Sequence, residues 1–245
     1  MSLIPKICYQ TWKDYNIPER WKNTIPQFKK FHPSWEHRFM TDADNVKFVE
    51  KNFPQYFDVY RKLRYNIQRV DMIRYMWLYH SGGIYLDMDM EPSRAFDSMF
   101  KNGNDLYLIQ SPYFAKYSND FLASVKGHPF WIDCLEEIKN YRSYSLYTRE
   151  MVILDTTGPW MIDRVFSRGK HFATIIPKNY FFPCDICGCN KSQVTPYVKK
   201  LEGNSWVSHS TWLPFLLYCY LYYIIILLVV IVVIIIVYLY MSRGR

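Results

Sequence analysis

The sequence predicts an α/β fold in which strands and helices alternate around a mainly parallel sheet. Three observations support this prediction: β-rich segments, apolar residues at helical spacing between them, and turn residues at the junctions. In such sheets ligands bind beyond the carboxyl ends of the strands. The predicted strands cover residues 4–12, 36–40, 84–86, 106–110 and 173–177. The predicted helices cover residues 21–31, 61–80, 130–141 and 159–168, and one more begins near Ala43.

The first half of the chain alternates strand and helix. Residues 4–12 form an apolar, β-rich segment, and residues 21–31 place apolar side chains at helical spacing until Pro33 ends the pattern. Thr41 follows the second strand and can cap the next helix, because its hydroxyl can accept from a backbone N–H of the first turn. Pro54 ends that helix.

The predicted helix over residues 61–80 has the clearest pattern. An apolar stripe runs along it, and Ser81-Gly82-Gly83 stops it. Residues 84–86 then form a β-rich run that leads into Asp87-Met88-Asp89. In the second half of the chain, Gly158-Pro159 starts a helix, since proline is tolerated in a first helical turn.

An apolar run from Leu213 to Met241 contains no charged residue. It exceeds the roughly 20 residues that a helix needs to cross the hydrocarbon core of a bilayer. Tyrosines gather at both of its ends, as in the aromatic belts of membrane spans. We therefore expect a folded domain over residues 1–212, a transmembrane helix over 213–241 and a short basic tail over 242–245. The short tail and the lack of a signal peptide favour a tail anchor with the domain in the cytosol.

The charge and cysteine content limit the partners of the chain. Its 245 residues carry a formal net charge of +8. A basic body suits anionic partners such as a nucleotide diphosphate or a phospholipid headgroup. The basic residues are scattered rather than gathered in blocks, which argues against nucleic-acid binding. In a cytosolic protein reduced thiols are the default. Cys184, Cys187 and Cys189 lack the second ligand pair of a structural zinc site, so we expect free thiols, with zinc as the less favoured alternative.

Asp87 and Asp89 lie at the exit of a predicted strand. Residues i and i+2 of a strand point to the same side, so both carboxylates can reach one ion. Hard divalent cations such as Mn²⁺ and Mg²⁺ take oxygen ligands and are commonly completed by phosphate oxygens of a substrate. An Asp-x-Asp sequence alone is more often an ordinary turn, and its surroundings decide between the two interpretations.

Those surroundings include the helix over residues 61–80. Asp71 and Arg74 stand three residues apart, so they share one face of that helix. A surface ion pair would explain these two residues by themselves. Because the helix leads through Gly82-Gly83 directly into the Asp-x-Asp segment, we favour a common functional site.

Three segments together resemble glycosyltransferase family 32, the glycosyltransferases with an Asp-x-Asp sugar-binding region. They are Arg69-Val70-Asp71-Met72-Ile73-Arg74-Tyr75, Gly82-Gly83-Ile84-Tyr85-Leu86-Asp87-Met88-Asp89 and the opening Ile4-Pro5-Lys6-Ile7-Cys8-Tyr9-Gln10-Thr11-Trp12. The family usually has Ile-His in place of Cys8-Tyr9. It includes yeast-type α-1,6-mannosyltransferases and inositol-phosphoceramide mannosyltransferases, and large clostridial glucosylating toxins share its core. The resemblance is close over residues 4–100 and looser to about 212.

The resemblance implies a GT-A fold and transfer of a hexose, with mannose favoured, with retention of configuration. The implied donor is a nucleotide diphosphate sugar such as GDP-mannose or a UDP-sugar, and the acceptor is a hydroxyl of a lipid or membrane-associated glycan. Thr157-Gly158-Pro159 resembles a turn that borders the acceptor side. The implied catalytic residues are Asp71, Arg74, Asp87 and Asp89, the last two at a Mn²⁺ or Mg²⁺ ion. The implied substrate-binding residues are Gln10, Thr11, Trp12, Gly83 and Tyr85.

His209-Ser210-Thr211-Trp212 is similar to the closing His…Ser-Trp element of the family, with a shorter spacing. The resemblance implies that His209 completes the metal shell and that Trp212 binds over the diphosphate. An ordinary histidine beside the membrane and an interfacial tryptophan are the alternative. If the element closes the site, the site lies near the bilayer, which favours a lipid-linked acceptor.

Two other classes of function stay open. A non-catalytic, membrane-anchored binding module would keep the fold for interaction, although the intact acidic and basic set argues against it. A metal-dependent phosphohydrolase also uses paired aspartates, but it would need further acidic ligands and a nucleophile motif that we do not find. The compact domain, the abundant Tyr, Asn and Lys and the predicted anchor are compatible with a large DNA virus as the source.

Overall fold

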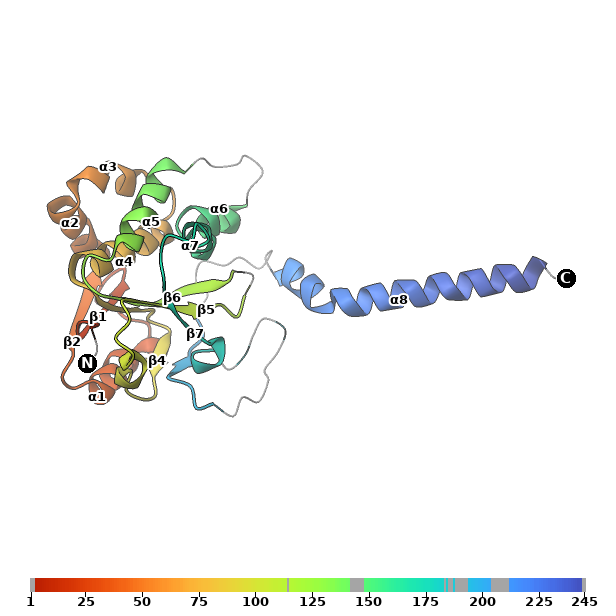
Figure 1. Cartoon of the computed structure of the whole chain (residues 1–245), viewed down its shortest axis with the longest axis horizontal. Helices are drawn as coiled ribbons and strands as arrows, with labels where there is room; N and C mark the ends of the chain where they lie inside the picture. Colours follow the sequence, from red (N-terminus) through yellow and green to blue (C-terminus); the bar gives the residue numbers. More distant parts are fainter. Residues whose placement is uncertain are drawn as a thin grey trace.

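The computed structural model describes residues 3–113, 115–141, 148–182, 194–203 and 212–243, together with Cys184 and Cys187. In these parts a six-stranded sheet is packed between helices, and one long C-terminal helix extends away from the body (Figure 1). The order of the strands in the sheet is β2 (Glu36–Thr41), β1 (Ile7–Trp12), β3 (Gly83–Leu86), β6 (Tyr117–Ser124), β5 (Leu106–Gln110) and β7 (Thr174–Ile176).

Three of the five neighbouring strand pairs in this sheet are parallel, so the predicted α/β fold with a mainly parallel sheet is confirmed. The exception is β6, which runs antiparallel to both β3 and β5. The sequence analysis did not predict β6. A second, two-stranded sheet joins β4 (Met90–Pro92) to β8 (Val198–Lys200), and it aligns Met90 with Lys200.

Most of the helices cover one face of the sheet, as Figure 1 shows for α2 to α7, while α1 lies on the other face. The helices of the body are α1 (Thr24–Phe31), α2 (Asp42–Asn52), α3 (Pro54–Lys62), α4 (Asn66–Ser81), α5 (Pro129–Asn140), α6 (Arg149–Thr156) and α7 (Pro159–Phe166). Short 3₁₀ turns occur at Glu19–Trp21, Asp97–Phe100 and Lys178–Tyr180.

The two faces of the sheet carry separate hydrophobic clusters because successive side chains of a strand point to opposite faces. In β3, Tyr85 packs with the helices α2 to α5, whereas its neighbours Ile84 and Leu86 pack on the opposite face with α1. All three side chains are buried. The sheet therefore forms the centre of the core and fixes where β3 ends.

Two local predictions can be compared with the structure. Thr41 caps α2 as expected: its Oγ1 accepts from the Asp44 N–H at 3.2 Å, and the Asp44 side chain accepts from the Thr41 N–H at 3.0 Å. The single helix expected over residues 61–80 is wrong, because α3 ends at Lys62 and Leu63 has an extended backbone. After the break, α4 begins as a new helix at Asn66 and carries Asp71 near its start.

Gly83 explains how β3 enters the sheet. Its φ is +102°, in the region that favours glycine, and a Cβ at this position would lie 2.4 Å from the Ile7 carbonyl oxygen. A larger residue could not approach β1 so closely. The glycine thus turns the end of α4 directly into a strand beside β1.

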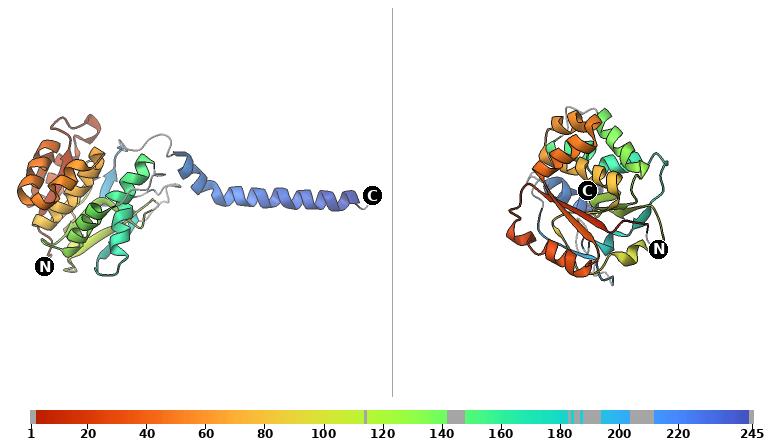
Figure 2. Two further views of the ribbon diagram at one scale, coloured as in Figure 1. Left: turned by 90° about the horizontal axis from the view of Figure 1, so that it is seen from above. Right: turned by 90° about the vertical axis from the view of Figure 1, so that its left-hand side faces the viewer.

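The last helix, α8 (Trp212–Arg243), agrees with the apolar segment expected over residues 213–241. Its window Cys219–Ile236 has a mean hydropathy of 3.2 and none of it is buried. By length and composition, this is the one helix in the described part of the chain that could cross a membrane. The left view in Figure 2 shows that it extends away from the body as one long helix.

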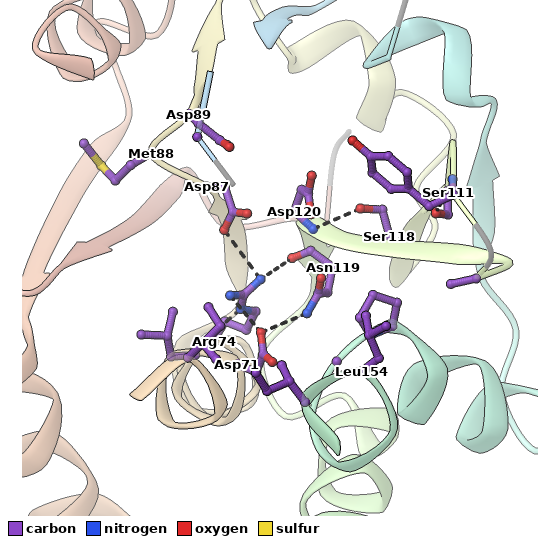
Figure 3. Close-up of a pocket in the computed structure, with 18 of the residues that line it drawn as sticks. Asp71, Arg74, Asp87, Met88, Asp89, Ser111, Ser118, Asn119, Asp120 and Leu154 are labelled. Carbon is purple, nitrogen blue, oxygen red and sulfur yellow. Dashed lines mark hydrogen bonds and ion pairs between the residues drawn. The ribbon is translucent and has the colours of Figure 1, made fainter. Parts of the chain in front are cut away.

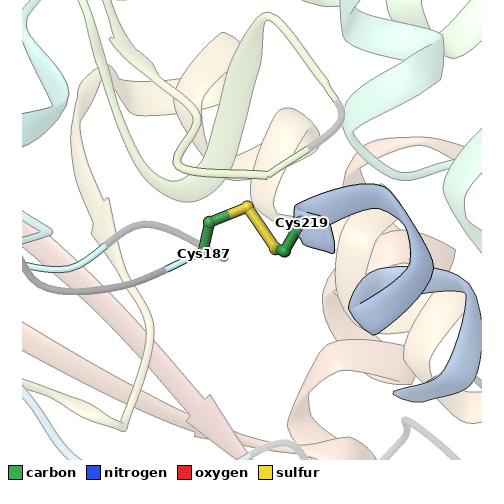
Figure 4. The surroundings of a disulfide bond; sticks show 2 residues. All are labelled: Cys187 and Cys219. Atoms are coloured by element: carbon green, nitrogen blue, oxygen red, sulfur yellow. A yellow bond between two sulfur atoms is a disulfide. The ribbon is translucent and has the colours of Figure 1, made fainter. Parts of the chain in front are cut away.

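The cysteines differ from the expected free thiols. Cys187 forms a disulfide with Cys219 at the start of α8, with their Cα atoms 5.2 Å apart (Figure 4). Cys184 is also disulfide-bonded. The prediction of free thiols is therefore wrong at both loop positions, and Cys189 lies outside the described residues. Buried Cys8 and Cys134 are free. A sequence pattern does not show this pairing, because the chain must first bring α8 beside the loop.

Candidate active site

A cavity of about 680 Å³ lies at the carboxyl ends of β1 and β3, between α4, α6 and α7. This is the edge at which an α/β sheet is expected to bind ligands. Thr11 and Trp12 line it from the end of β1, and Asp87 and Asp89 line it from the end of β3. Met88 and Asp89 lie in a turn after β3, which the Met90 N–H closes by donating to the Asp87 carbonyl at 3.1 Å. In Figure 3, Met88 points away from the two carboxylates.

Asp71 and Arg74 form a buried ion pair on α4. The Arg74 Nη2 lies 3.0 Å from the Asp71 Oδ1, and the two residues are only 2% and 3% exposed. Asp71 also accepts from Asn119 Nδ2 at 3.0 Å and from Thr157 Oγ1 at 2.8 Å. These contacts tie α4 to β6 and to the end of α6. Such a buried and fully bonded pair is unlike the exposed surface pair that was the alternative.

Arg74 also joins the helix to the Asp-x-Asp segment. Its Nη1 lies 3.5 Å from the Asp87 Oδ1 and donates to the Asn119 carbonyl at 2.6 Å. Its guanidinium sits 4.2 Å from the centre of the Tyr85 ring, and the Tyr85 hydroxyl donates to Asp87 at 2.5 Å. Asp87 is therefore held by two groups that are themselves immobilised by packing.

The backbone of Asp87-Met88-Asp89 is fixed by groups from distant parts of the chain. The Asp87 N–H donates to the Asp120 carbonyl at 2.9 Å, and Thr24 donates to the Met88 carbonyl at 2.9 Å. The Leu201 N–H donates to the Asp89 carbonyl at 2.7 Å. A segment so bonded positions its two carboxylates rigidly, as a ligand or catalytic site requires.

A third carboxylate and a lysine complete the acidic cluster. Lys200 Nζ lies 2.9 Å from both Asp89 Oδ1 and Asp120 Oδ2. The pairing of β8 with β4 delivers Lys200 to this place, since it aligns Lys200 with Met90, the residue after Asp89. Gly203, three residues after Lys200, lies beside Asp89: a Cβ at this position would be 2.8 Å from Asp89 Oδ2. This side of the cavity is therefore tightly packed.

Burial dominates the titration of the acidic cluster. It raises the pKa of Asp71 to about 7, and it raises the pKa of Asp89 to about 7 and that of Asp87 above its usual value. Burial acts in the same direction on Asp120, but Lys200 beside it holds the pKa of Asp120 below its usual value. The cavity thus concentrates carboxyl groups that would gain from a bound cation.

The structure brings most of the predicted site residues together, but not all of them. Asp71, Arg74, Asp87 and Asp89 line one cavity, and so do three of the predicted substrate-binding residues, Thr11, Trp12 and Tyr85. Gln10 and Gly83 are not among the lining residues. Gln10 is fully buried, where it donates to the Asp87 carbonyl at 3.4 Å and contacts His37 at 2.9 Å, so it supports the Asp87 backbone. Gly83 instead allows the close approach of β3 to β1 described above.

The closing element lies largely beyond what the structure describes. His209 falls outside the described residues, as do Ser210 and Thr211. Trp212 begins α8, and its side chain is not described. Their expected roles at the metal and the diphosphate stay predictions. Gly158 and Pro159 of the predicted acceptor turn do line the cavity.

Sequence reasoning missed Asn119, Asp120 and Lys200. The first two sit on β6, and the third sits on β8, and neither strand has an apolar pattern that marks it in the sequence. Lys200 meets Asp120 and Asp89 across 80 and 111 positions of the chain, through the pairing of β8 with β4. A lone lysine in a basic chain gives no signal of such a contact.

The donor set suits a hard divalent cation, because carboxylate oxygens are the ligands that Mg²⁺ and Mn²⁺ prefer. Within the described residues, however, no group of three His, Cys, Asp or Glu side chains is close enough to hold a metal ion by itself. An ion at Asp87 and Asp89 would therefore depend on other ligands, such as phosphate oxygens and water.

Residues 18–105 match the family described as glycosyltransferase sugar-binding region containing the DXD motif. The matched region contains Asp71, Arg74, Asp87 and Asp89. The chain carries the sugar-binding region of the Asp-x-Asp glycosyltransferases. The resemblance inferred from the sequence motifs is thereby confirmed.

Curated relatives agree with this assignment. Over 184 residues this chain is 33% identical to mannosyl phosphorylinositol ceramide synthase SUR1 of Saccharomyces cerevisiae, covering 73% of this chain and 45% of that protein. It is 30% identical to inositol phosphoceramide mannosyltransferase 1 of Schizosaccharomyces pombe, covering 69% and 53%. The chain thus spans about half the length of these yeast relatives. A protein of Acanthamoeba polyphaga mimivirus, named as an uncharacterized glycosyltransferase, is 25% identical and is covered to 85%.

Solved structures show the same fold. The PaToxG glycosyltransferase superposes with a TM-score of 0.53 at 18% identity, covering 68% of this chain and 70% of that one. The UDP-bound glycosyltransferase domain of the YGT toxin superposes with a TM-score of 0.51 at 8% identity, covering 74% and 81%. The expected GT-A fold is therefore confirmed.

Proposed function

We propose that this chain is a retaining glycosyltransferase that moves a hexose from a nucleotide diphosphate sugar to a hydroxyl of a membrane-associated acceptor. One observation carries the proposal: Asp71, Arg74, Asp87 and Asp89 converge from α4 and β3 on a single cavity at the ligand-binding edge of the sheet. A surface ion pair and an ordinary acidic turn would have no reason to meet in this way.

The donor site follows from the residues at the two strand ends. Trp12 stacks edge-on against Trp21, with ring centres 4.8 Å apart, and its buried indole N–H has no acceptor among the described residues. Buried polar groups are nearly always paired, so a ligand oxygen is the natural partner of this donor. We assign Trp12 and Thr11 to the nucleotide, and Asp71 and Arg74 to the hydroxyls of the transferred sugar.

A divalent ion, Mn²⁺ or Mg²⁺, is assigned to Asp87 and Asp89, where it would stabilise the departing diphosphate. His209 is a further candidate ligand, and Trp212 a candidate to bind over the diphosphate. The protein's part is to hold these groups in fixed positions: Tyr85 and Arg74 orient Asp87, and the Leu201 N–H anchors the Asp89 backbone. Preorganised charge of this kind is usually the largest contribution to catalysis.

Mannose from GDP-mannose is the favoured donor, with UDP-sugars next, because the yeast relatives are named as mannosyltransferases acting on inositol phosphoceramide. A lipid acceptor also fits the position of α8. Cys219 and Tyr220 of this helix line the cavity, and Cys219 begins the apolar window. A cavity bordered by the candidate membrane span would take an acceptor whose headgroup stands at the bilayer surface.

We infer that the folded domain over residues 1–212 faces an oxidising compartment. Within the apolar run 213–241, Cys219 and Tyr220 still contact the body, so the residues after them form the membrane span, and 242–245 are a tail. Disulfides persist in oxidising compartments and are rare in the cytosol. The Cys187–Cys219 disulfide therefore opposes the cytosolic domain expected from the sequence. It supports a domain on the lumenal or external side of the membrane.

The test is a donor screen on the full chain in detergent with Mn²⁺. Release of free sugar, or transfer to added inositol phosphoceramide, is scored for GDP-mannose and for UDP-sugars. Asp89→Asn should abolish turnover without unfolding the chain, whereas Asp58→Asn, an exposed position on α3, should leave turnover unchanged. Full activity in the Asp89 variant would rule out its metal role. Donor binding without any turnover would favour the rival function, a non-catalytic binding module.

A further inference from the structure

Lys200 occupies a position in the acidic cluster that the proposed function does not use. Its Nζ bridges Asp89 Oδ1 and Asp120 Oδ2, each at 2.9 Å, and all three side chains are at least three-quarters buried. An ammonium group so placed satisfies two carboxylates at once. It stands at one of the two aspartates assigned to the divalent ion.

Lys200 and a divalent ion would compete for Asp89. Both cations need a carboxylate oxygen of Asp89, and Lys200 already holds Oδ1 at 2.9 Å. The other oxygen, Oδ2, faces Gly203, where any side chain larger than hydrogen would place its Cβ 2.8 Å away. Lys200 can yield because lysine carries three donors on a flexible four-carbon stem. Its second ion pair, with Asp120, would keep the ammonium in the cavity after it leaves Asp89.

The balance of charge supports an added cation. The cluster of four carboxylates, Asp71, Asp87, Asp89 and Asp120, faces two basic groups, Arg74 and Lys200. When all are ionised, two negative charges are left over, which one divalent ion neutralises. A nucleotide diphosphate would then bring new negative charge beside Lys200, and charge-assisted bonds to phosphate are among the strong hydrogen bonds.

We propose that Lys200 is a tethered counter-cation of the donor site. In the free protein it holds Asp89 and Asp120 together. When the divalent ion binds, Lys200 leaves Asp89 and donates to the diphosphate, while Asp120 acts as the positioning residue that keeps it within reach. This inference rests on the proposed function, since it assumes a nucleotide diphosphate and a divalent ion in the cavity.

The proposal makes ion and nucleotide binding mutually dependent. The ion alone must displace an existing ion pair, so it binds weakly. A nucleotide diphosphate offers the displaced ammonium a new partner, so each ligand should strengthen the binding of the other by the same factor. A lysine that only stabilises the fold would produce no such coupling.

The experiment measures binding to the full chain in detergent, independently of turnover. Mn²⁺ affinity is measured by electron paramagnetic resonance of the free ion, and GDP and UDP affinities by calorimetry at saturating Mn²⁺. The variant is Lys200→Gln. Its matched control is Lys199→Gln, which removes the same charge from the neighbouring, exposed position of β8. Thermal melting of each variant reports on folding.

In Lys200→Gln, we expect Mn²⁺ alone to bind as tightly as to the wild type or up to about 10-fold more tightly. The better-bound nucleotide should bind about 10- to 100-fold more weakly at saturating Mn²⁺, the loss expected for a hydrogen bond between charged groups. Lys199→Gln should change neither affinity by more than about twofold, because exposed charges contribute little.

Three results would overturn the proposal. Nucleotide affinity in Lys200→Gln equal to that in Lys199→Gln would remove the phosphate role, and weaker Mn²⁺ binding would remove the competition. A wild-type chain that binds neither Mn²⁺ nor nucleotide would overturn the proposed function itself. If Lys200→Gln does not fold, Asp120→Asn provides the test, because it leaves the Lys200–Asp89 pair intact. Its nucleotide affinity should fall about 3- to 10-fold, and an unchanged value would contradict the positioning role.

Discussion

Arg74 Nη1 lies 3.5 Å from Asp87 Oδ1, and this contact couples helix α4 to the exit of strand β3. The same guanidinium is bonded to Asp71 on its own helix and to the Asn119 carbonyl on β6. Three elements thus meet at one buried positive charge. The two halves of the predicted motif, Asp71 with Arg74 and Asp87 with Asp89, are parts of a single network.

Replacing Arg74 tests this network. Arg74→Gln removes the charge that compensates buried Asp71 and Asp87, and breaking a buried ion pair typically costs about 3–5 kcal/mol. We expect a loss of that size in the free energy of unfolding, measured by urea denaturation. Arg61→Gln, at an exposed position of α3, should stay within about 0.5 kcal/mol of the wild type. Equal stability of the two variants would mean that the network contributes nothing to folding.

Asp71 predicts a dependence of stability on pH. Burial raises its pKa to about 7 in the folded state, whereas an unfolded chain has the ordinary value of about 4. The folded state therefore holds a proton that the unfolded state releases. The resulting stabilisation is complete below about pH 4 and is lost as the pH rises through 7.

The free energy of unfolding should thus fall between about pH 4 and 7, by up to about 1.4 kcal/mol per pH unit from this group, and this contribution should level off above pH 7. Urea denaturation without divalent ions measures the slope. Asp71→Asn should make the slope shallower, because an amide does not titrate in this range, while Asp89, whose pKa burial also raises to about 7, still contributes. The interpretation fails if the wild type and Asp71→Asn lose stability in parallel.

Replacing Gly83 tests the close approach of β3 to β1 that positions the site. Gly83→Ala combines a φ of +102° with a Cβ placed 2.4 Å from the Ile7 carbonyl oxygen. We expect a loss of about 3 kcal/mol or more, since both strain and a backbone clash arise. Gly169→Ala is the matched control: its φ is +70°, but no atom lies within 4 Å of the added Cβ. It should cost about 1 kcal/mol. Equal losses by thermal melting would show that the clash is relieved.

The disulfide predicts a covalent link between the body and α8. Mass spectrometry of a non-reduced digest of protein from a eukaryotic membrane fraction should find the Cys187 peptide joined to the Cys219 peptide. Cys8 and Cys134 should react with a thiol reagent only after unfolding, because both are fully buried. Alkylation of Cys187 and Cys219 without a reductant would contradict both the link and the oxidising compartment.

Local patterns were sufficient for the elements that begin and end with strong signals. Thr41, Pro54 and the Gly82-Gly83 pair each fix a boundary through a cap, a blocked hydrogen bond or a positive φ, and all three boundaries were predicted correctly. Where no such signal exists, as at Leu63, the helical pattern continued across a real break. Strand β6 was missed for the same reason, because polar Ser118, Asn119 and Asp120 interrupt its apolar pattern.

By itself, the sequence was enough to predict the α/β class and the apolar C-terminal helix. It also predicted Asp71, Arg74, Asp87 and Asp89 as candidate site residues, because their grouping depends on spacing along one helix and at the end of one strand. The tertiary structure alone decided which distant groups complete the cavity. Asn119, Asp120 and Lys200 reach it through strand pairing, and Cys187 meets Cys219 only after α8 comes beside the loop. Such contacts depend on register and topology, which local periodicity does not encode.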